Sequence, residues 1–326
     1  MSAGPRIQKT PHKPLVALTG ATGFIGRYLL QELPKRGYRL RVLLRRAETL
    51  PQGCAGAVIG DLARPYNMSE ALAGVDAIIH TAGLAATMTG VPEDDYRLFN
   101  TEATVGFAKA AQRAKIKRFV FLSSIRAQSG PTAEGILTEE HEPRPTDAYG
   151  RSKLAAENGL AATGLDWVAL RLALVYGPGV EGNVAKLVKL ARSPYPLPLA
   201  GLKGEHSLLG LDNLVEAVDT VLAAEAPLRR PLLVADPKPL TIGAMIAAMR
   251  HGLGRRPALL YVPEPLMKGA LHVSGRLQSF EPLFGSLIAD SSALVKLNWA
   301  PRVETVAGLT ALLRGGNPSD VATQHK

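Results

Sequence analysis

The stretch Thr19-Gly20-Ala21-Thr22-Gly23-Phe24-Ile25-Gly26 decides the fold of this chain. The apolar run Leu15-Val16-Ala17-Leu18 comes directly before it, and apolar residues at helical spacing follow it as far as Leu33. The three glycines therefore lie where a strand would pass into a helix. Glycine permits a tight turn and a close approach of the backbone to a neighbouring group. Beyond this turn, short β-rich runs alternate with helical stretches, which predicts βα units and a parallel sheet.

A turn of this kind can hold the pyrophosphate of a dinucleotide. The free amides and the positive dipole end of a helix attract phosphate oxygens. The spacing, however, is GxxGxxG rather than the GxGxxG of the usual fingerprint. Taken alone, the turn fits either a dinucleotide site or a glycine-rich connection that binds nothing.

Length and composition limit the class of protein. A chain of 326 residues can bury a large core, in one domain or two lobes. Without a long apolar run or a signal-peptide core, we expect a cytoplasmic protein with no membrane span. The single cysteine, Cys54, excludes an internal disulfide and a paired-thiolate metal site, so no metal is expected. Residues 1–13 and 317–326 are predicted to be flexible tails, the first of them basic.

The formal net charge of +10 would suit nucleic acid or a phosphorylated metabolite. Aromatic residues are few and are not interleaved with the basic ones, which argues against stacking on single-stranded nucleic acid. We therefore expect no nucleic-acid partner, and most of these cations are equally well explained as a solvated surface.

The second strand, 39–44, is followed by Arg45 and Arg46. In dinucleotide-binding folds an acidic residue near this point holds the ribose hydroxyls, whereas an arginine accommodates a 2′-phosphate. The pattern favours NADP, with NAD as the other possibility. Long basic side chains also commonly face solvent, so the arginines alone do not decide between the two cofactors.

Two further strand ends carry candidate cofactor residues. Asp61 and Leu62 follow a strand predicted at 57–60, and the carboxylate fits either a contact to adenine or a cap for the next helix. Thr81-Ala82-Gly83 follows a strand predicted at 75–80, and its small side chains would let a cofactor lie close to the backbone. His80 has no second metal-type side chain at ligand spacing, so it is interpreted as a buried histidine.

The fifth strand, 118–122, ends at Ser123-Ser124, where hydroxyls face either the mouth of a site or the loop backbone. Further on, Tyr149 and Lys153 are spaced i, i+4, which puts both side chains on one helix face. A nearby cation would favour the phenolate and bring the pKa of the tyrosine towards neutral pH. An isolated pair of this kind is also common on solvated helix faces.

Taken in order, these motifs resemble the extended short-chain dehydrogenase/reductase family, also called NAD-dependent epimerase/dehydratase, over about residues 14–314. Asn100 and the runs 147–153, 171–179 and 297–301 add to the resemblance. It implies an α/β fold with a Rossmann-type doubly wound parallel sheet and a smaller C-terminal α+β substrate lobe. The implied dinucleotide-binding domain spans 14–176 and 208–236, and the implied substrate lobe spans 177–207 and 237–316.

The resemblance also implies roles for particular side chains. Ser124 would orient and polarise a substrate carbonyl, Tyr149 would be the general acid/base, and Lys153 would lower the pKa of Tyr149 and hold the nicotinamide ribose. The cofactor site predicted from motifs and resemblance together comprises Gly20, Thr22, Gly23, Phe24, Ile25, Gly26, Arg45, Asp61, Leu62, Thr81, Ala82, Gly83, Tyr149, Lys153 and Val175.

Within the family, the runs 177–183, 212–214 and 286–290 look most like the branch that acts on UDP-sugars, which contains 4-epimerases and the 4-keto-reductases that make UDP-N-acetylquinovosamine. By this resemblance, Ser124 and Asn183 would contact the nucleotide-sugar substrate. His206 stands where the branch usually has an arginine for the diphosphate, and losing that fixed charge would weaken the contact.

The predicted function is reduction of a 4-keto UDP-sugar at C4, with NADP as the preferred cofactor and a homodimer as the expected assembly. An NAD-dependent UDP-sugar 4-epimerase is the alternative, which Arg45 disfavours. A third interpretation, from another class, is a catalytically idle cofactor-binding structural or RNA-associated protein. The presence of Ser124, Tyr149 and Lys153 together disfavours the third interpretation.

Overall fold

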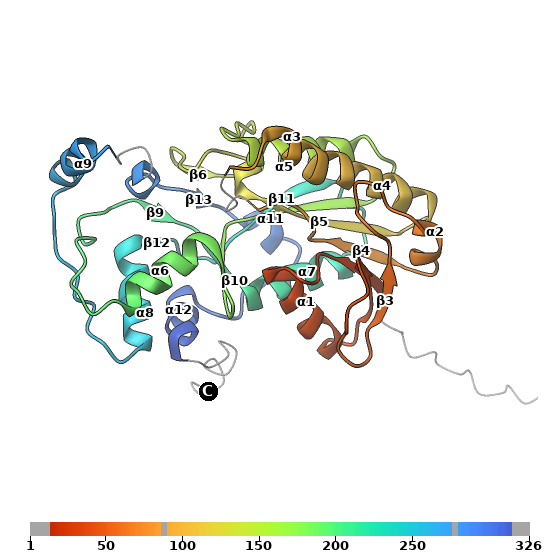
Figure 1. Cartoon of the computed structure of the whole chain (residues 1–326), viewed down its shortest axis with the longest axis horizontal. Coiled ribbons are helices and arrows are strands. Elements are labelled where there is room, and N and C mark those ends of the chain that lie inside the picture. The colour runs from red at the N-terminus through yellow and green to blue at the C-terminus, as the bar shows by residue number, and fades with distance from the viewer. Residues whose placement is uncertain (1–13, 86–89, 276–279, 315–326) are drawn as a thin grey trace, which may run out of the picture.

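The structure, a computed structural model, describes residues 14–85, 90–275 and 280–314. Within these ranges a seven-stranded parallel sheet forms the centre of the larger lobe (Figure 1). In sheet order its strands are β11 (Arg230–Val234), β7 (Trp167–Leu172), β5 (Arg118–Ser124), β4 (Ala77–His80), β1 (Leu15–Thr19), β2 (Arg39–Leu44) and β3 (Ala55–Val58). The predicted α/β fold with a doubly wound parallel sheet is confirmed. The predicted tails, 1–13 and 317–326, lie outside the described residues. Residues 315 and 316, which belong to the predicted substrate lobe, lie outside them as well.

Helices cover both faces of this sheet because successive side chains of each strand point to opposite faces. In β1, Val16 and Leu18 join the core beneath α1 (Phe24–Lys35) and α7 (Leu211–Ala223), whereas Ala17 joins the core on the other face. That second face is covered by α2 (Met68–Ala71), α3 (Glu93–Tyr96), the π-helical turn η1 (Arg97–Glu102), α4 (Ala103–Arg113) and α5 (Ala148–Ala161).

The smaller lobe has an apolar core of its own (Figure 1). It is built from α6 (Gly182–Arg192), α8 (Ile242–Gly252), α9 (Glu264–Val273), α12 (Thr305–Arg314) and the pair β9 (Glu205–His206) and β12 (Leu240–Thr241). Short connecting elements are β8 (Leu174–Tyr176) paired with β10 (Leu208–Gly210), β6 (Ile136–Leu137) paired with β13 (Ile288–Ala289), η2 (Ile125–Ala127), η3 (Glu281–Leu283) and α11 (Ser292–Val295). The predicted boundaries between the two domains stay predictions. No helix in the described ranges has both the length and the apolar character needed to cross a membrane.

The bounds of three expected strands differ in detail. The third strand runs over 55–58 instead of 57–60, because its partner β2 ends at Leu44, which lies opposite Val58. The fourth strand begins at Ala77 instead of residue 75, and the fifth continues to Ser124, which is paired with Leu172. The ends of a strand depend on pairing with distant strands, which local periodicity does not encode.

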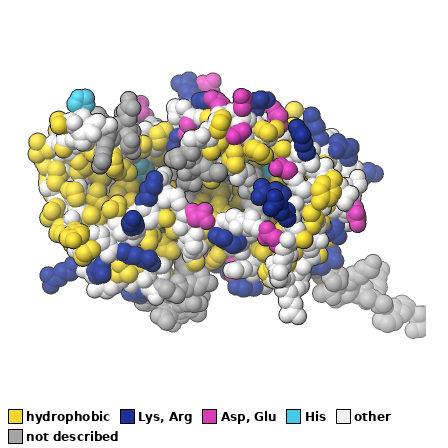
Figure 2. Space-filling view, in the orientation of Figure 1, with side chains coloured by type: hydrophobic (Ala, Val, Ile, Leu, Met, Phe, Trp, Pro, Cys, Tyr) yellow, Lys and Arg dark blue, Asp and Glu magenta, His cyan; other side chains and the backbone are white. Residues whose placement is uncertain are grey.

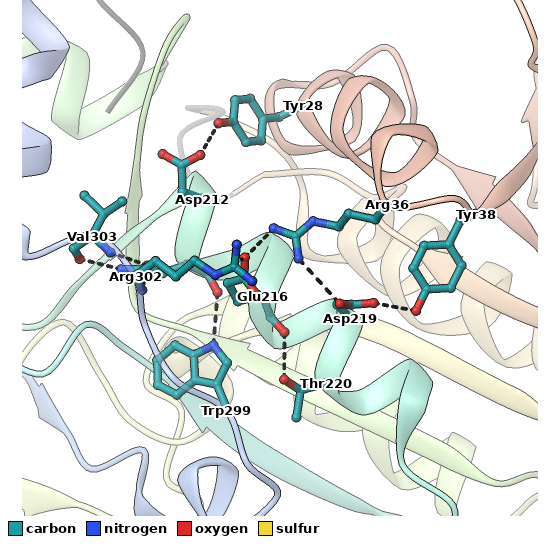
Figure 3. Close-up of polar contacts among 11 residues, drawn as sticks. Tyr28, Arg36, Tyr38, Asp212, Glu216, Asp219, Thr220, Trp299, Arg302 and Val303 are labelled. Atoms are coloured by element: carbon teal, nitrogen blue, oxygen red, sulfur yellow. Dashed lines mark hydrogen bonds and ion pairs between the residues drawn. The ribbon is translucent and has the colours of Figure 1, made fainter. Parts of the chain in front are cut away.

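Polar contacts on two sides of α7 hold it to α1 and to the segment that leads into α12 (Figure 3). On one side, Tyr28 of α1 donates to Asp212 over 2.6 Å. On the other, Trp299 Nε1 donates to the carbonyl oxygen of Asn213 over 3.2 Å, and the Asn213 side chain accepts from the amide of Val303 over 3.0 Å. Arg302 completes this side with an ion pair to Glu216. The segment that leads into α12 is thereby held against a helix of the dinucleotide-type half.

The glycine turn after β1 leaves no room for a side chain at its last position. A Cβ on Gly26 would lie 2.0 Å from the carbonyl oxygen of Gly20. Gly20 itself has a positive φ of 68°, which L side chains rarely adopt. The first turn of α1 therefore packs directly on the backbone of the preceding loop.

We expect Gly26→Ala to lower the free energy of unfolding by about 3 kcal/mol or more, because the clash is with backbone that cannot rotate away. Gly106→Ala is the matched control, since Gly106 lies within helix α4 and a Cβ there would meet nothing within 4 Å. This control should be neutral or stabilise the protein by up to about 1 kcal/mol. Denaturant unfolding of the three proteins makes the comparison, and similar stabilities for both variants would contradict the proposed role of Gly26.

Candidate active site

The site lies where β1 and β4 end side by side at the centre of the sheet. Thr19 is paired with His80, and β2 and β5 lie on the outer sides of these two strands. Strand order thus proceeds in opposite directions from the β1–β4 pair. In open α/β sheets such a switch point opens a crevice at the carboxyl ends of the strands.

The glycine turn places the N-terminus of α1, which suits an anion, on one side of this crevice. The first turn of α1 has neither a side-chain cap nor an acidic residue, so its amides and its positive dipole end stay available. A Cβ on Gly20 would lie 2.4 Å from Thr81 Oγ1 and 2.6 Å from the amide nitrogen of Ala82. The structure thus brings together two stretches that the sequence predicted separately, 20–26 and 81–83. Their close backbone packing fits a pyrophosphate with its adjoining ribose.

His80 supports this turn from beneath and is almost completely buried. Its Nδ1 lies 2.7 Å from Thr19 Oγ1, and its Nε2 lies 2.9 Å from Thr104 Oγ1. Burial lowers the pKa of His80 to about 3, so the ring is neutral at physiological pH. The interpretation of His80 as a satisfied buried histidine is confirmed. Among the described residues, no group of three His, Cys, Asp or Glu side chains could hold a metal ion.

Asn100 connects the loop after β4 to α5, a role that the sequence did not reveal. Its Oδ1 accepts from the amide of Leu84 over 2.7 Å, and its Nδ2 donates to Ser152 Oγ over 3.1 Å. Gly83 lies so close that a Cβ there would be 2.7 Å from Asn100 Oδ1. A useful signal was present in the sequence, because Asn100 interrupts the apolar face formed by Tyr96 and its helical neighbours.

Ser124 and Tyr149 meet at the carboxyl end of β5. Ser124 accepts a hydrogen bond from the amide of Arg126 over 3.1 Å, and its side chain is also hydrogen-bonded to the phenol of Tyr149. Tyr149 lies in the first turn of α5, which Asp147 caps by accepting from the amide of Gly150 over 2.6 Å. Both readings of the Ser124 hydroxyl therefore apply, since it bonds the loop backbone and faces the tyrosine.

Burial, rather than Lys153, dominates the acidity of Tyr149. Desolvation raises the pKa of Tyr149 to about 12, and the hydrogen bond from Ser124 and the charge of Arg126 only partly oppose it. The sequence led us to expect a pKa lowered by Lys153. The ammonium lies 5.9 Å from the centre of the tyrosine ring and instead donates to the carbonyl oxygen of Leu122 over 3.0 Å. At neutral pH the phenol is therefore protonated.

Lys153 is buried among apolar and aromatic groups. Its Nζ lies 4.6 Å from the centre of the Phe121 ring, a cation–π contact. Burial lowers the pKa of Lys153 to about 8, while the charge of Glu157 opposes this shift. A Cβ on Gly83 would lie 3.7 Å from Nζ, so the ammonium lies beside the loop that follows β4.

A buried ion pair lies directly behind Lys153. Glu157 and Arg171 are each only 3 % exposed and are joined through both carboxylate oxygens, with 2.5 Å between Arg171 Nη2 and Glu157 Oε2. Ser123 Oγ donates to Glu157 over 2.5 Å, and Arg171 also donates to Gln128. The sequence contained two signals for this cluster: Glu157 continues the four-residue spacing of Tyr149 and Lys153, and Arg171 interrupts the apolar strand β7.

The remaining predicted residues lie around this centre. Arg45 is exposed directly after β2, the neighbour of β1. Asp61 is exposed beyond β3 and accepts from the amide of Ala63 over 2.9 Å. The next helix, α2, begins at Met68, so Asp61 closes a turn and does not cap that helix. Leu62 and Val175 are partly buried against the two cores on either side of the sheet.

Asn183 and His206, the predicted substrate contacts, both belong to the smaller lobe. Asn183 is exposed at the start of α6, with its Oδ1 3.4 Å from Lys186 Nζ. His206 is in β9, and its buried Nε2 has no hydrogen-bond partner within the described part of the chain. Burial lowers the pKa of His206, so its ring is neutral at physiological pH. The structure does not bring these two residues into contact with Ser124, Tyr149 or Lys153.

Comparison with known proteins fits this arrangement. The model of the NAD-dependent epimerase/dehydratase family matches residues 16–232. The chain belongs to this family. UDP-glucose 4-epimerase from Vibrio cholerae is 31 % identical over 88 % of this chain and 90 % of its own length. Ceramide reductase from Caulobacter vibrioides is 28 % identical over 90 % of this chain and 87 % of its own.

Solved structures of the epimerase/dehydratase family also resemble this one. MoeE5 in complex with UDP-glucose and NAD superposes with a TM-score of 0.71 at 26 % identity, covering 94 % of this chain and 99 % of that one. The family resemblance inferred from the sequence is thereby confirmed. The protein is an enzyme of the NAD-dependent oxidoreductase and epimerase type, with relatives that include epimerases and ketoreductases.

We expect Glu157→Gln to lower the free energy of unfolding by about 3 to 5 kcal/mol, because Arg171 would remain buried without a counter-charge. The matched control is Glu93→Gln, which breaks the exposed pair between Glu93 and Arg151 and should cost less than about 1 kcal/mol. Denaturant melts of both variants test this difference. Equal losses would show that the buried pair contributes no more than a surface one.

Proposed function

We propose that this enzyme reduces a ketone at C4 of a UDP-linked sugar, using a Ser124, Tyr149 and Lys153 site. The observation that carries the proposal is the protonated Tyr149 phenol, hydrogen-bonded to Ser124 and set on the same helix as the buried Lys153. Reduction of a carbonyl needs a proton donor at the oxygen, and a phenol with a pKa raised to about 12 is in its acid form at neutral pH.

In this proposal each side chain has one task. The hydroxyl of Ser124 donates to the carbonyl oxygen of the substrate, where negative charge develops. Tyr149 transfers its proton to that oxygen. Lys153, protonated at neutral pH, places a positive charge beneath the tyrosine and limits the cost of leaving a phenolate. When bound, the dinucleotide supplies the hydride that adds to the carbonyl carbon.

The cofactor site fits a dinucleotide because the turn at Gly20, Gly23 and Gly26 presents uncapped amides against closely packed backbone. We propose NADP as the preferred form. Arg45 and Arg46 are exposed at the end of β2, where a 2′-phosphate is accommodated in this fold, and the first acidic residue beyond β2 is Glu48. NAD is the alternative cofactor, because the structure of MoeE5 contains NAD.

A UDP-sugar is supported by the similarity to UDP-glucose 4-epimerase and by the UDP-glucose in the MoeE5 structure. We propose that Asn183 contacts this substrate from the smaller lobe and that His206 contributes one hydrogen bond through its unpartnered Nε2. An epimerase would use the same residues but would keep its cofactor bound and show no net oxidation of it. The homodimer and the cytoplasmic location expected from the sequence stay predictions.

One observation favours a second candidate, a long-chain ketone as substrate. Burial keeps the His206 ring neutral, so it offers a diphosphate no positive charge. The similarity to ceramide reductase, which spans 90 % of this chain, agrees with a substrate that carries no diphosphate. Assays should therefore include both a UDP-4-keto-sugar and a long-chain ketone, each with NADPH and with NADH.

We expect Tyr149→Phe to reduce the rate of NADPH oxidation by about 100-fold to 10,000-fold with whichever ketone is turned over, since the proton donor is removed. Cofactor affinity, measured by fluorescence titration, should change far less than the rate. Tyr195→Phe is the control, because Tyr195 is 73 % exposed on the smaller lobe. Full activity in Tyr149→Phe would rule out the proposed mechanism. Retained NAD and interconversion without NADPH would instead identify an epimerase.

The NADP preference has a separate test. Arg45→Asp should weaken NADPH binding by about tenfold or more, because a charge-assisted contact to the 2′-phosphate is lost and a like charge takes its place. NADH binding should not weaken. Arg113→Asp makes the same change at another exposed arginine, at the end of α4, and should leave both affinities unaltered. If Arg45→Asp affects NADPH and NADH alike, the arginine does not select the cofactor.

A further inference from the structure

The smaller lobe exposes an unusual number of large apolar side chains on its outer side. Five of them are named here the α9 surface: Tyr195 (73 % exposed), Leu260 (53 %), Tyr261 (68 %), Leu266 (67 %) and Val273 (89 %). Figure 2 shows hydrophobic side chains gathered over this lobe, with Lys and Arg side chains along its lower edge. Single exposed apolar residues are common on soluble proteins, whereas a group of them marks a surface that contacts something.

Helix α9 contributes a continuous apolar stripe to this surface. Leu266, Ala270 and Val273 are spaced i, i+4 and i+7, so they lie on one helix face, and all three are exposed. Another face of the helix is in contact with the lobe: Met267 packs against the core, and Lys268 Nζ lies 5.0 Å from the centre of the Phe284 ring. No residue of α9 is buried. The helix therefore rests on the lobe and presents its apolar stripe outward.

The segment that carries Leu260 and Tyr261 leads into this helix and is held in place by backbone hydrogen bonds. The amide of Leu260 donates to the carbonyl oxygen of Leu197 over 2.8 Å, which aligns the segment before α9 with the segment that contains Tyr195. The buried Arg250 donates to the carbonyl oxygens of both Tyr195 and Pro257, over 2.8 and 2.6 Å. The apolar side chains are thus presented from a fixed backbone that leads directly into α9 (Figure 1).

The segments that carry this surface contain mostly positive charges. Segments 189–203 and 251–275, which carry it, contain six Lys and Arg residues and a single acidic residue, Glu264. Glu264 is paired with Lys268 at 2.6 Å, and Arg255 and Arg256 are exposed. A surface whose segments carry both exposed apolar side chains and cations suits a bilayer with anionic headgroups, because the apolar groups enter the interface while the cations face the headgroups.

Two other occupants fit these features less well. A nucleic acid would neutralise the positive charge but would leave the aliphatic side chains of Leu266 and Val273 exposed to water. A second copy of this chain packed face to face would bury the apolar stripe but would bring two positively charged surfaces together. We propose that the α9 surface docks this enzyme onto an anionic lipid bilayer. The inference is independent of the substrate and of the cofactor preference proposed above.

The test uses the full chain and vesicles of phosphatidylcholine, with and without phosphatidylglycerol, in a co-sedimentation assay. We expect binding to the vesicles that contain phosphatidylglycerol, little binding to phosphatidylcholine alone, and weaker binding as salt is raised. Val273→Glu and Leu266→Glu should each lower the partition coefficient by about tenfold, since they place an anion at the interface. Val295→Glu is the matched control, because Val295 is 51 % exposed on α11, outside the α9 surface.

The charge contribution has its own matched pair. Arg255→Glu with Arg256→Glu should abolish vesicle binding, whereas Arg229→Glu with Arg230→Glu, another adjacent exposed pair, should not. Thermal unfolding and NADPH affinity confirm that every variant is folded. Absence of vesicle binding, or equal losses in the matched variants, would overturn the proposal. So would a dimer that Val273→Glu converts to a monomer, or tight RNA binding that depends on the α9 surface.

Discussion

The contact between Gly26 and the carbonyl oxygen of Gly20 is the constraint on which the rest of this structure depends. At this distance the helix α1 can begin only where its third residue has no side chain. The result is a helix whose first amides lie level with the ends of β1 and β4 and stay uncapped. The close packing and the proposed anion binding therefore have the same origin, since both need bare backbone at this turn.

Helix α5 carries three of the ionisable side chains of the candidate site. Tyr149, Lys153 and Glu157 follow one another at four-residue intervals along one face, from the mouth of the crevice into the core. Each of these side chains is less exposed to solvent than the one before it, and the effect on its ionisable group differs. The tyrosine stays a phenol, the lysine becomes less basic, and Glu157 forms a buried ion pair with Arg171. The site thus combines a proton donor, a cation and a buried counter-charge without a metal ligand set among the described residues.

The segment that leads into α12 of the smaller lobe is held both by α7 and by the apolar core of the larger lobe. Trp299 donates to the carbonyl oxygen of Asn213 in α7, and its side chain is buried in that core together with Leu294 (Figure 3). The smaller lobe's own apolar core leaves helix α9 on the outside, with apolar side chains and cations exposed together. One lobe therefore carries the predicted catalytic groups, while the other carries the proposed substrate contacts and the proposed docking surface.

The sequence by itself determined the parallel sheet, the glycine turn and the order of Ser124, Tyr149 and Lys153, because each of these depends on local periodicity or on a spacing of a few residues. Strand ends that depend on a distant partner, such as that of β3, needed the fold. Asn100, Glu157 and Arg171 became recognisable as one support for the site only when helix and strand were packed together. The acidity of Tyr149 was also decided by tertiary structure: sequence spacing placed a cation on its helix face, but burial and the turn of Lys153 towards Leu122 reversed the expected shift in pKa. Desolvation depends on everything that surrounds a group, and a linear pattern records only its neighbours along the chain.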